Sequence, residues 1–463
     1  MPVSPARRAA FEILRRVAEE SAYSSALLAA SGEELNPKDR GLTHELVLGT
    51  LRRQLWLDRA IEHFAGRKIE KLDLPVVLAL RMGLYQLRFL SRIPPSAAVN
   101  ESVNLVRAAK LKSAASFANA VLRQATREPE YDPAAEVDDP IEKLTIETSH
   151  PRWLVERWIA QFGFDEAASI ARANNAAARL VFRFTAKAES RNRSSEILEE
   201  LRAAGADLQP SSIVTEAWHT AGGKDVEEEA DEERPTVKTA PRSVTLLQRL
   251  SEDGLIYFQD EGSQLVARMI GGRPGDRILD VCAAPGSKST LIAALSPAAM
   301  ILAGDRYEHR VRTIKQFAAL QEAGNIQTIV HDAQRELPLK SGLFDRVLVD
   351  APCSGTGTLR HNPEIRWRLK PSDIAELAAK QNSILRNAAA MVGGGGVLIY
   401  STCSLETEEN EAVVAHFCET QADFQVATLN VPANLLTRDG SVRTWPHRDG
   451  TDGFYVRAFS RKS

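Results

Sequence analysis

Five short apolar runs in the second half of the chain place the strongest limit on its fold. After Leu255 the segments RILDVCA, MILAGD, TIVHD, RVLVDAP and GGVLIYSTC are separated by stretches of helical character. Short buried strands alternating with helices are typical of a doubly wound α/β sheet. Ligands of such sheets bind at the carboxyl ends of the strands. Each run carries a polar or reactive residue at its end, which predicts a site along that edge.

The remaining sequence predicts two more parts. A chain of 463 residues is long for one core, so several domains are expected. Apolar residues at helical spacing predict an all-α domain over residues 1–135, and mixed signals predict a small α+β element over 145–250. That element contains an acidic insertion at 222–234, with seven acidic and two basic residues. The α/β domain then occupies 251–463.

Charge is unevenly distributed along the chain. The whole protein has a net charge of -3, but its first 130 residues carry 20 Lys and Arg against 14 Asp and Glu. An excess of six positive charges is a weak indication of a nucleic-acid partner. We therefore expect the all-α domain to bind RNA or DNA.

Cysteine usage and hydropathy exclude several classes of protein. The four cysteines, at positions 282, 353, 403 and 418, have no paired zinc-ligand spacing and do not form a disulfide framework. No apolar run approaches the length of about 20 residues that crosses a bilayer, and no secretory signal follows the basic N-terminus. We expect a cytoplasmic monomer with no metal and no membrane partner.

A glycine-containing turn between a strand and a helix, ILDVCAAPGSKST, predicts a cofactor loop. It has neither the Walker A spacing nor GxGxxG. Asp305, Asp332 and Asp350 each end a later strand, where a carboxylate can accept hydrogen bonds from ribose hydroxyls. Any one of them alone would equally suit a helix N-cap. Their recurrence in successive units favours a ligand site.

Two cysteines follow buried strands at the same predicted edge. Cys353 and Cys403 lie in VLVDAPCSGTG and LIYSTCSLETEENE, before polar or glycine-rich loops. A lone cysteine is more often an inert buried thiol, which is our interpretation of Cys282 and Cys418. A thiolate that adds to C6 of a pyrimidine makes C5 nucleophilic toward an electrophilic methyl group. Asp350 could then hydrogen-bond the cytosine edge, while the second thiol helps to remove the C5 proton or to release the product.

The same segments resemble a known family. LDVCAAPGSKST, DAPCSGTGTLRHNPEIRW and YSTCSLETEENE are similar to the motifs of RNA cytosine-C5 methyltransferases of the RsmB/Sun family. ELVLGTLRRQLWLD, MGLYQLRFLSRIPPSAAVNESVNL and FANAVLR resemble the NusB-like domain that precedes the methyltransferase in the 16S ribosomal RNA enzymes. The resemblance implies an all-α NusB-like domain, a small RNA-binding element and a Rossmann-like methyltransferase domain. DNA cytosine-C5 methyltransferases differ, because their nucleophile is the cysteine of the earlier motif.

The resemblance also implies a cofactor, a substrate and the role of each site residue. The cofactor is S-adenosylmethionine, and the substrate is 16S rRNA or an early small-subunit assembly intermediate. Cys403 is the nucleophile, Cys353 acts in product release, and Asp350 and Lys288 complete the catalytic set. The implied cofactor residues are Cys282, Ala283, Ala284, Pro285, Gly286, Ser287, Lys288, Asp305, Asp332 and Asp350. Most relatives have glycine where Ser287 stands.

Two other functions fit parts of the sequence. The same chemistry could act on another RNA, such as a tRNA, because the methyltransferase motifs do not specify the RNA. A NusB-like regulatory factor without activity is the second alternative, and the intact Cys353, Cys403, Asp305 and Asp350 argue against it.

The basic excess of the first 130 residues generates a test. Lys and Arg that neutralise phosphates release counterions, so RNA affinity should fall steeply between about 50 and 200 mM salt. The dissociation constant of the full-length protein for a 16S rRNA fragment, measured across that range, checks this. An affinity independent of salt would contradict the expected role.

Overall fold

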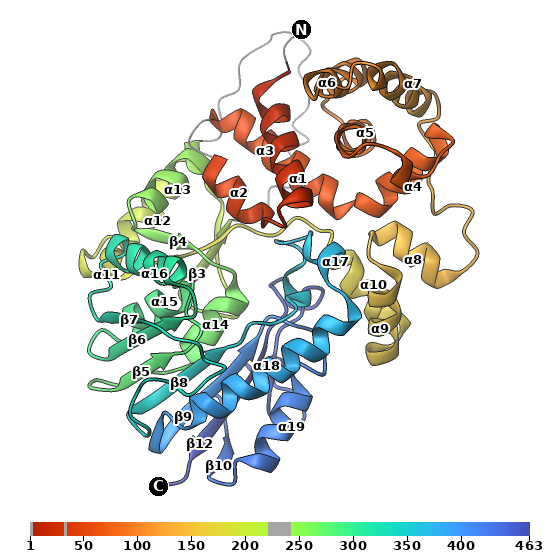
Figure 1. Cartoon of the computed structure of the whole chain (residues 1–463). Helices are drawn as coiled ribbons and strands as arrows, with labels where there is room; N and C mark the ends of the chain where they lie inside the picture. The colour runs from red at the N-terminus through yellow and green to blue at the C-terminus, as the bar shows by residue number, and fades with distance from the viewer. Residues whose placement is uncertain (1–2, 32–34, 221–241) are drawn as a thin grey trace. The chain divides into compact units, whose positions relative to one another are not determined.

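The computed structural model describes residues 3–31, 35–220 and 242–463, so the acidic insertion at 222–234 lies outside the described residues. Its contacts divide the chain into two compact units (Figure 1). The first comprises Met1–Ala177 and Leu359–Leu369, and the second Ala178–Thr358 and Lys370–Ser463. The boundaries expected at residues 135, 145 and 250 stay a prediction, because this division does not separate the small element from the methyltransferase part.

The first unit is helical, as the spacing of apolar residues predicted. Prolines at the first turn begin several of its helices, where the missing N–H costs no hydrogen bond. Its elements are α1 (Pro5–Glu19), α2 (Ser24–Ser31), α3 (Pro37–Arg52), α4 (Gln54–Ala65), η1 (Ile69–Lys71), α5 (Leu74–Phe89), α6 (Pro95–Ala108), α7 (Ala114–Arg127), α8 (Pro140–Thr148), α9 (Arg152–Phe162), α10 (Phe164–Ala173) and α17 (Ile365–Arg368).

Helix α5 forms the centre of this unit. It is buried over almost its whole circumference, with Leu80, Met82 and Leu84 fully inaccessible. A helix that is apolar all round must be surrounded by others, and α1, α3, α4, α6 and α7 all contact α5. Gly83 permits the closest approach, because a Cβ there would lie 2.8 Å from the Ser102 hydroxyl. The run LPVVLALRMGLYQLRFL thus supplies the core of the domain.

A segment from much later in the chain completes the first unit. Leu359–Leu369 follows the Cys353 loop in sequence but is embedded among the N-terminal helices. Arg366 is fully buried there and donates to the carbonyl oxygens of Thr148 (3.3 Å) and Ser149 (3.1 Å) and to Oδ1 of Asn175 (2.9 Å). The late segment therefore forms part of the packing of the helical unit.

Neighbouring residues of the segment make further hydrogen bonds inside the helical unit. The buried carboxylate of Glu364 accepts from both the backbone N–H (2.8 Å) and the hydroxyl (2.9 Å) of Ser24. The Arg368 guanidinium donates to the carbonyl oxygens of Val17 (2.9 Å) and Ala22 (2.6 Å). These bonds satisfy backbone groups at the end of α1 and the start of α2, which would otherwise lack partners.

The second unit begins with a small antiparallel sheet in the order β2-β3-β1-β4. The predicted strand RLVFRFTA forms its β1, and Phe182, Ile197 and Leu250 lie in its core. The expectation of a small α+β element is confirmed. Its elements are β1 (Val181–Phe184), α11 (Ala186–Ser190), α12 (Ser194–Ala203), β2 (Leu208–Pro210), β3 (Ala217–Thr220), α13 (Arg242–Glu252) and β4 (Ile256–Phe258).

The large sheet of the second unit has the order β10-β12-β9-β8-β5-β6-β7, with β11 paired to β12. All five predicted apolar runs form its parallel strands, from β5 to β9, and β10 and β12 extend it antiparallel. Its elements are α14 (Glu261–Met269), β5 (Arg277–Asp280), α15 (Ser287–Leu295), β6 (Met300–Asp305), α16 (Glu308–Leu320), β7 (Ile326–Val330), β8 (Phe344–Asp350), η2 (Thr356–Thr358), α18 (Pro371–Ala389), β9 (Val392–Thr402), α19 (Glu411–Thr420), β10 (Phe424–Ala427), η3 (Ala433–Leu435), β11 (Val442–Arg443) and β12 (Tyr455–Arg461).

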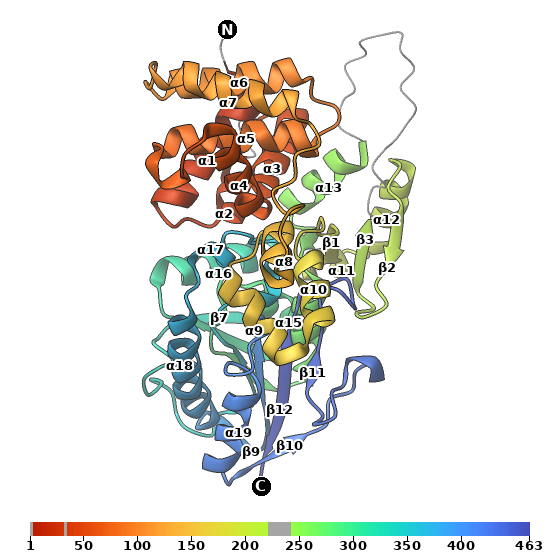
Figure 2. The same ribbon diagram turned by 90° about the vertical axis from the view of Figure 1, so that its right-hand side faces the viewer.

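Helices cover both faces of this sheet. Alternate residues of β8 belong to different clusters: Leu348 packs with Leu265 of α14, and Val347 packs with Leu385 of α18. Figure 2 shows α18 and α19 together on one side of the strands. Burial on both faces explains why the strands are continuous apolar runs. The doubly wound architecture expected from the sequence is confirmed.

Among the residues that the structure describes, no helix combines the length and apolar character that a bilayer crossing requires.

The buried Arg366 generates a stability test. Arg366→Met would leave carbonyl groups of the α8–α9 turn without donors, and we expect it to lower stability by about 2–5 kcal/mol. Denaturant unfolding of the full-length protein measures this. Arg123→Met is the matched control, because Arg123 is exposed on the same unit and bonds only Asn119 of its own helix. Equal stability of both variants would contradict the structural role of the segment.

Candidate active site

The predicted cofactor loop, residues 282–288, connects β5 to α15. Gly286 ends the loop with φ of 110°, in the left-handed region that favours glycine. A Cβ at this position would lie 3.3 Å from Cα of Ile314, so glycine also allows the close approach of α16. Ser287, which replaces the usual second glycine, is the first residue of α15 and has ordinary helical geometry.

Lys288 and Asp350 form an ion pair between α15 and the end of β8. The Lys288 ammonium donates to Oδ2 of Asp350 at 2.7 Å, and the Ser401 hydroxyl donates to Oδ1 at 2.8 Å. Burial lowers the pKa of Lys288, while the charge and the hydrogen bond of Asp350 raise it. The net result is a raised pKa. Cys403 acts in the same direction. The lysine is therefore a fixed cation beside the predicted nucleophile.

The two predicted catalytic thiols are brought together. Cys353 follows β8 and Cys403 follows β9, and their Sγ atoms lie 3.3 Å apart. Both side chains are half-buried. The pKa of Cys353 is raised well above its usual value, first by its hydrogen bond to Cys403 and then by burial. Cys418 is exposed on α19 and takes no part in the pair.

The strand-end carboxylates gather at the start of the loop. Cys282 is half-buried, and desolvation raises the pKa of its thiol well above the usual value, while Asp280, Asp350 and Asp305 raise it further in that order. The negative charges of these three carboxylates therefore all act on Cys282. Asp280 was not among the predicted residues, although its position at the end of β5 follows the same strand-end rule. Its Oδ2 accepts from the Ser289 hydroxyl at 2.6 Å.

Asp280 differs from the other carboxylates because it is wholly buried. Burial raises its pKa to about 7, and its Oδ1 has no hydrogen-bond partner in the described part of the chain. A buried unpaired carboxylate oxygen is costly, and a ligand donor would relieve that cost. The convergent carboxylates and the glycine turn thus fit a ligand rich in hydroxyl and amino groups, such as S-adenosylmethionine.

Asp305 and Asp332 lie farther along the same edge. Asp305 ends β6, is 5% exposed, and its carboxylate accepts from the Tyr307 backbone N–H at 3.1 Å and pairs with Arg310 at 3.3 Å. Asp332 follows β7 and accepts from the Gln334 backbone N–H at 3.1 Å. Asp305 does not occupy the N-cap of α16, so the alternative of a simple helix cap does not hold for it.

Arg183 supports the cofactor loop from the small sheet. Arg183 lies on β1 of the small α+β element, and its side chain is fully buried. The guanidinium donates to the carbonyl oxygen of Ser287 at 3.1 Å and to the Thr290 hydroxyl at 2.9 Å, both in the first turns of α15. Burial lowers the pKa of Arg183 to about 10. Sequence alone gave no signal of this role, because the two segments are about 100 residues apart.

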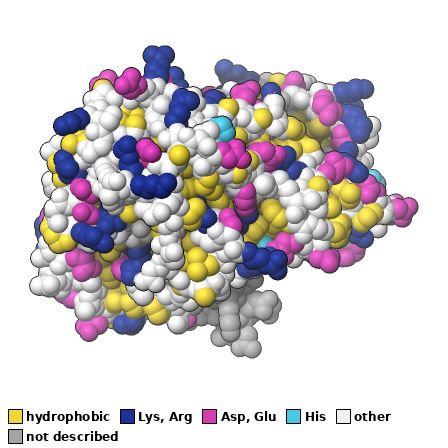
Figure 3. Space-filling view, turned by 90° about the horizontal axis from the view of Figure 1, so that it is seen from below, with side chains coloured by type: hydrophobic (Ala, Val, Ile, Leu, Met, Phe, Trp, Pro, Cys, Tyr) yellow, Lys and Arg dark blue, Asp and Glu magenta, His cyan; other side chains and the backbone are white. Residues whose placement is uncertain are grey.

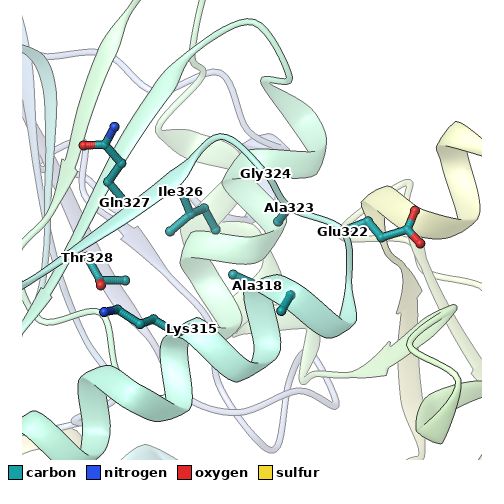
Figure 4. A pocket seen from close by; sticks show the side chains of 9 residues that line it. Lys315, Ala318, Glu322, Ala323, Gly324, Ile326, Gln327 and Thr328 are labelled. Atoms are coloured by element: carbon teal, nitrogen blue, oxygen red, sulfur yellow. The ribbon is translucent and has the colours of Figure 1, made fainter.

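A pocket elsewhere on the second unit is distinct from this site. It has a volume of about 540 Å³ and lies between the end of α16 and the start of β7. Figure 4 shows Lys315, Ala318 and Ile326 on its wall. Lys315 and Ala318 lie on α16 and Ile326 begins β7, whereas Asp305 ends β6 and Asp332 follows the carboxyl end of β7. On the face seen in Figure 3, basic and acidic side chains are interspersed, so that face has no continuous basic track.

The fold and the site define a methyltransferase. Residues 267–460 match the family described as 16S rRNA methyltransferase RsmB/F, residues 4–127 match the NusB family, and residues 150–227 match the ferredoxin-like domain of RsmF/B-like methyltransferases. A probable ribosomal RNA small subunit methyltransferase B of Bacillus subtilis is 34% identical over the whole of both chains. A relative of the same description from Synechocystis is 33% identical, covering 97% of this chain and 98% of its own.

The chain belongs to the 16S rRNA methyltransferase RsmB/F family. S-adenosylmethionine, expected from the sequence, is the cofactor of this family. Among solved structures, the crystal structure of PH0851 has a TM-score of 0.81 at 24% identity and covers both chains fully. NSun6 from Pyrococcus horikoshii with SFG has a TM-score of 0.57 at 20% identity, over 68% of this chain and 98% of that one. These two likenesses establish the fold alone.

Proposed function

We propose that this protein transfers a methyl group from S-adenosylmethionine to C5 of a cytosine in 16S rRNA, through a covalent adduct between Cys403 and C6 of the base. The observation that carries the proposal is the pair of thiols, 3.3 Å apart, beside the Lys288–Asp350 ion pair. A single nucleophile would need only one thiol at this edge. Two thiols match a reaction with separate addition and release steps.

The proposed cofactor residues are those of the loop and the strand ends. Residues 282–288, Asp305, Asp332 and Asp350 would hold S-adenosylmethionine, which supplies an electrophilic methyl group when bound. The 5% exposure of Asp305 leaves its carboxylate largely shielded from water, where a hydrogen bond to a ribose hydroxyl is strong. The adjacent Asp280 oxygen adds a further buried acceptor.

The catalytic residues would act in a fixed order. The Cys403 thiolate would add to C6, the C5–C6 electron pair would move to C5, and C5 would then take the methyl group as the bond from that methyl group to the cofactor sulfur breaks, with S-adenosylhomocysteine as the leaving group. A base then removes the C5 proton, and the bond between C6 and Cys403 breaks, which restores the aromatic ring. Lys288 stabilises negative charge at Cys403, and Asp350 accepts a hydrogen bond from the cytosine amino group. Cys353 acts in the last steps, as the neighbouring thiol that promotes release.

The RNA substrate rests on a different observation. Relatives described as ribosomal RNA small subunit methyltransferase B match this chain over nearly its full length, including the NusB-like domain. The methyltransferase motifs by themselves do not distinguish rRNA from tRNA. Bisulfite sequencing after reaction with 16S rRNA and with tRNA transcripts separates the two substrates. Methylation confined to tRNA would refute the rRNA proposal.

Asp305 provides a test of cofactor binding. Asp305→Ala removes a carboxylate that would accept from the ribose, and the loss of about 1.5–3 kcal/mol corresponds to a roughly ten- to hundredfold weaker affinity for S-adenosylmethionine. Titration calorimetry measures it. Asp423→Ala is the control, because the Asp423 side chain is 77% exposed at the far edge of the sheet. Unchanged affinity of Asp305→Ala would remove this residue from the site.

The two thiols should give opposite phenotypes. Cys403→Ala cannot form the adduct, so methylation and covalent complex should both be absent. In Cys353→Ala, addition and methyl transfer still occur but release is slow, so an enzyme–RNA complex should accumulate and survive denaturing electrophoresis. Cys418→Ala, at an exposed thiol, should behave as the unmodified protein.

Loop cytosines should trap the enzyme best, because a base already out of its stack costs less to present to the thiol. If Cys403→Ala traps RNA and Cys353→Ala does not, the roles of the two thiols are reversed.

A further inference from the structure

Glu409 is a buried acid that the proposed reaction does not use. It lies just before α19, is 0% exposed, and its carboxylate accepts four hydrogen bonds. Oε1 accepts from the backbone N–H of Ser354 and from Nε2 of Gln381, both at 2.9 Å. Oε2 accepts from the hydroxyls of Ser354 and Ser404. Every acceptor direction of the carboxylate is therefore occupied.

The two serines are the residues that directly follow the catalytic thiols. Ser354 is bonded to Cys353 in the chain, and Ser404 to Cys403. Their hydroxyl oxygens lie 2.9 Å apart and meet at the same carboxylate oxygen, while the two Sγ atoms lie 3.3 Å apart. One side chain thus joins two loops that are 50 residues apart in sequence.

We propose that Glu409 is the positioning residue of the active site, and that its carboxylate holds the Cys353 and Cys403 loops at the separation that the two-thiol reaction needs. This inference rests on the proposed roles of the two cysteines. The four hydrogen bonds of Glu409 go to Ser354, Ser404 and Gln381, so it acts through its neighbours on the thiols.

A second layer of bonds fixes Glu409 itself. The Tyr400 hydroxyl donates to the Glu409 carbonyl oxygen, and its oxygen lies 3.2 Å from Oε1 of Gln381. Gln381 also donates to the carbonyl oxygen of Pro352 at 2.9 Å, next to Cys353. Such an interlocked network leaves the carboxylate one position. A flexible, solvent-exposed side chain could not hold the two loops at one fixed distance, as the buried Glu409 does.

A carboxylate suits this position for a physical reason. Burial raises the pKa of Glu409, while the donors from Ser354, Ser404 and Gln381 favour its charged form. Two of the four donors, the Ser354 N–H and the Gln381 amide, cannot accept, so an acceptor must face them. Charge-assisted hydrogen bonds are also stronger than neutral ones. Serine hydroxyls alone would leave these donors unpaired.

The test separates the two loops by removing one hydroxyl at a time. Ser404→Ala removes the hydrogen bond that ties the Cys403 loop to Glu409. Single-turnover methyl transfer to a 16S rRNA transcript should therefore slow by about tenfold. Ser354→Ala removes the hydrogen bond from the Ser354 hydroxyl, in the Cys353 loop, to Glu409. The rate of single-turnover transfer should stay near that of the unmodified protein, while the rate of multiple turnover should fall. Covalent enzyme–RNA complex should then accumulate in Ser354→Ala, as it should in Cys353→Ala.

Ser441→Ala is the matched control for both variants. The Ser441 hydroxyl is also buried and donates to a carboxylate, Oδ2 of Asp439 at 2.8 Å, and its other partners among the described residues are Tyr455 and Arg457 on β12. All three variants lose one buried hydroxyl, and none should change S-adenosylmethionine affinity in calorimetry. A merely structural role for Ser354 and Ser404 would give three similar enzymes, which would overturn the inference.

Glu409 itself is tested with two substitutions. In Glu409→Gln the amide oxygen can still accept from the Ser354 N–H and Gln381, and the amide NH2 can donate to both hydroxyls. This variant should keep most of the activity, whereas Glu409→Ala should lose both transfer and release. Equal defects in the two variants would mean that charge rather than position matters, which would overturn the inference. If Cys353→Ala traps no RNA, the proposed function itself fails, and that outcome is visible without any Glu409 variant.

Discussion

The parallel pairing of β8 with β9 is the constraint on which the active site depends. The ladder aligns Asp350 with Ser401 and continues through a bond from the Ala351 N–H to the Ser401 carbonyl oxygen at 2.8 Å. Parallel strands end at the same edge, so the loops that follow them emerge side by side. Cys353 and Cys403 lie two or three residues beyond the aligned pair, and this short distance leaves little freedom in how their thiols approach each other.

The surroundings of the site show how a hydrophobic sheet supports buried charge. Leu348 and Val347 bury opposite faces of the same strand, and that packing supplies the rigid frame. At the edge, Lys288 neutralises Asp350, while Asp280 is buried without a cation bonded to it and has a pKa of about 7. Charges at this partly buried edge of the sheet interact strongly, because little water screens them. Strong interactions of this kind suit a site where a thiolate must form and later leave.

One short segment belongs to a different compact unit from the residues on either side of it in the chain. The segment that follows the Cys353 loop, Leu359–Leu369, belongs by its contacts to the helical unit. Arg366 satisfies carbonyl groups of the turn before α9, and Glu364 satisfies the start of α2. The Cys353 loop therefore leads directly into a segment that is part of the helical unit. A chain that began at Pro151 would lack the Thr148 and Ser149 carbonyl oxygens that accept from Arg366.

The sequence by itself determined the fold class and most of the proposed site. The length and the spacing of the apolar runs predicted the strands β5 to β9. The reactive residues at the ends of these runs predicted a site that contains Asp305, Asp350, Cys353 and Cys403, because parallel strands bring their carboxyl ends to one edge. The antiparallel strands β10 and β12 were not among the predicted runs, because polar or charged residues interrupt their apolar stretches, FQVA and YVRAFSR.

Only the tertiary structure decided which distant residues support the site. Arg183 lies about 100 residues before the loop that it holds, and Glu409 joins two serines that are 50 residues apart. No local pattern marks such residues, because a buried polar side chain is recognised by its partners and not by its neighbours in the chain. The sequence fixes local periodicity and the chemistry of each side chain, whereas the burial of Asp280, Arg183 and Glu409, and with it their charge and their bonds, arises only when the segments pack.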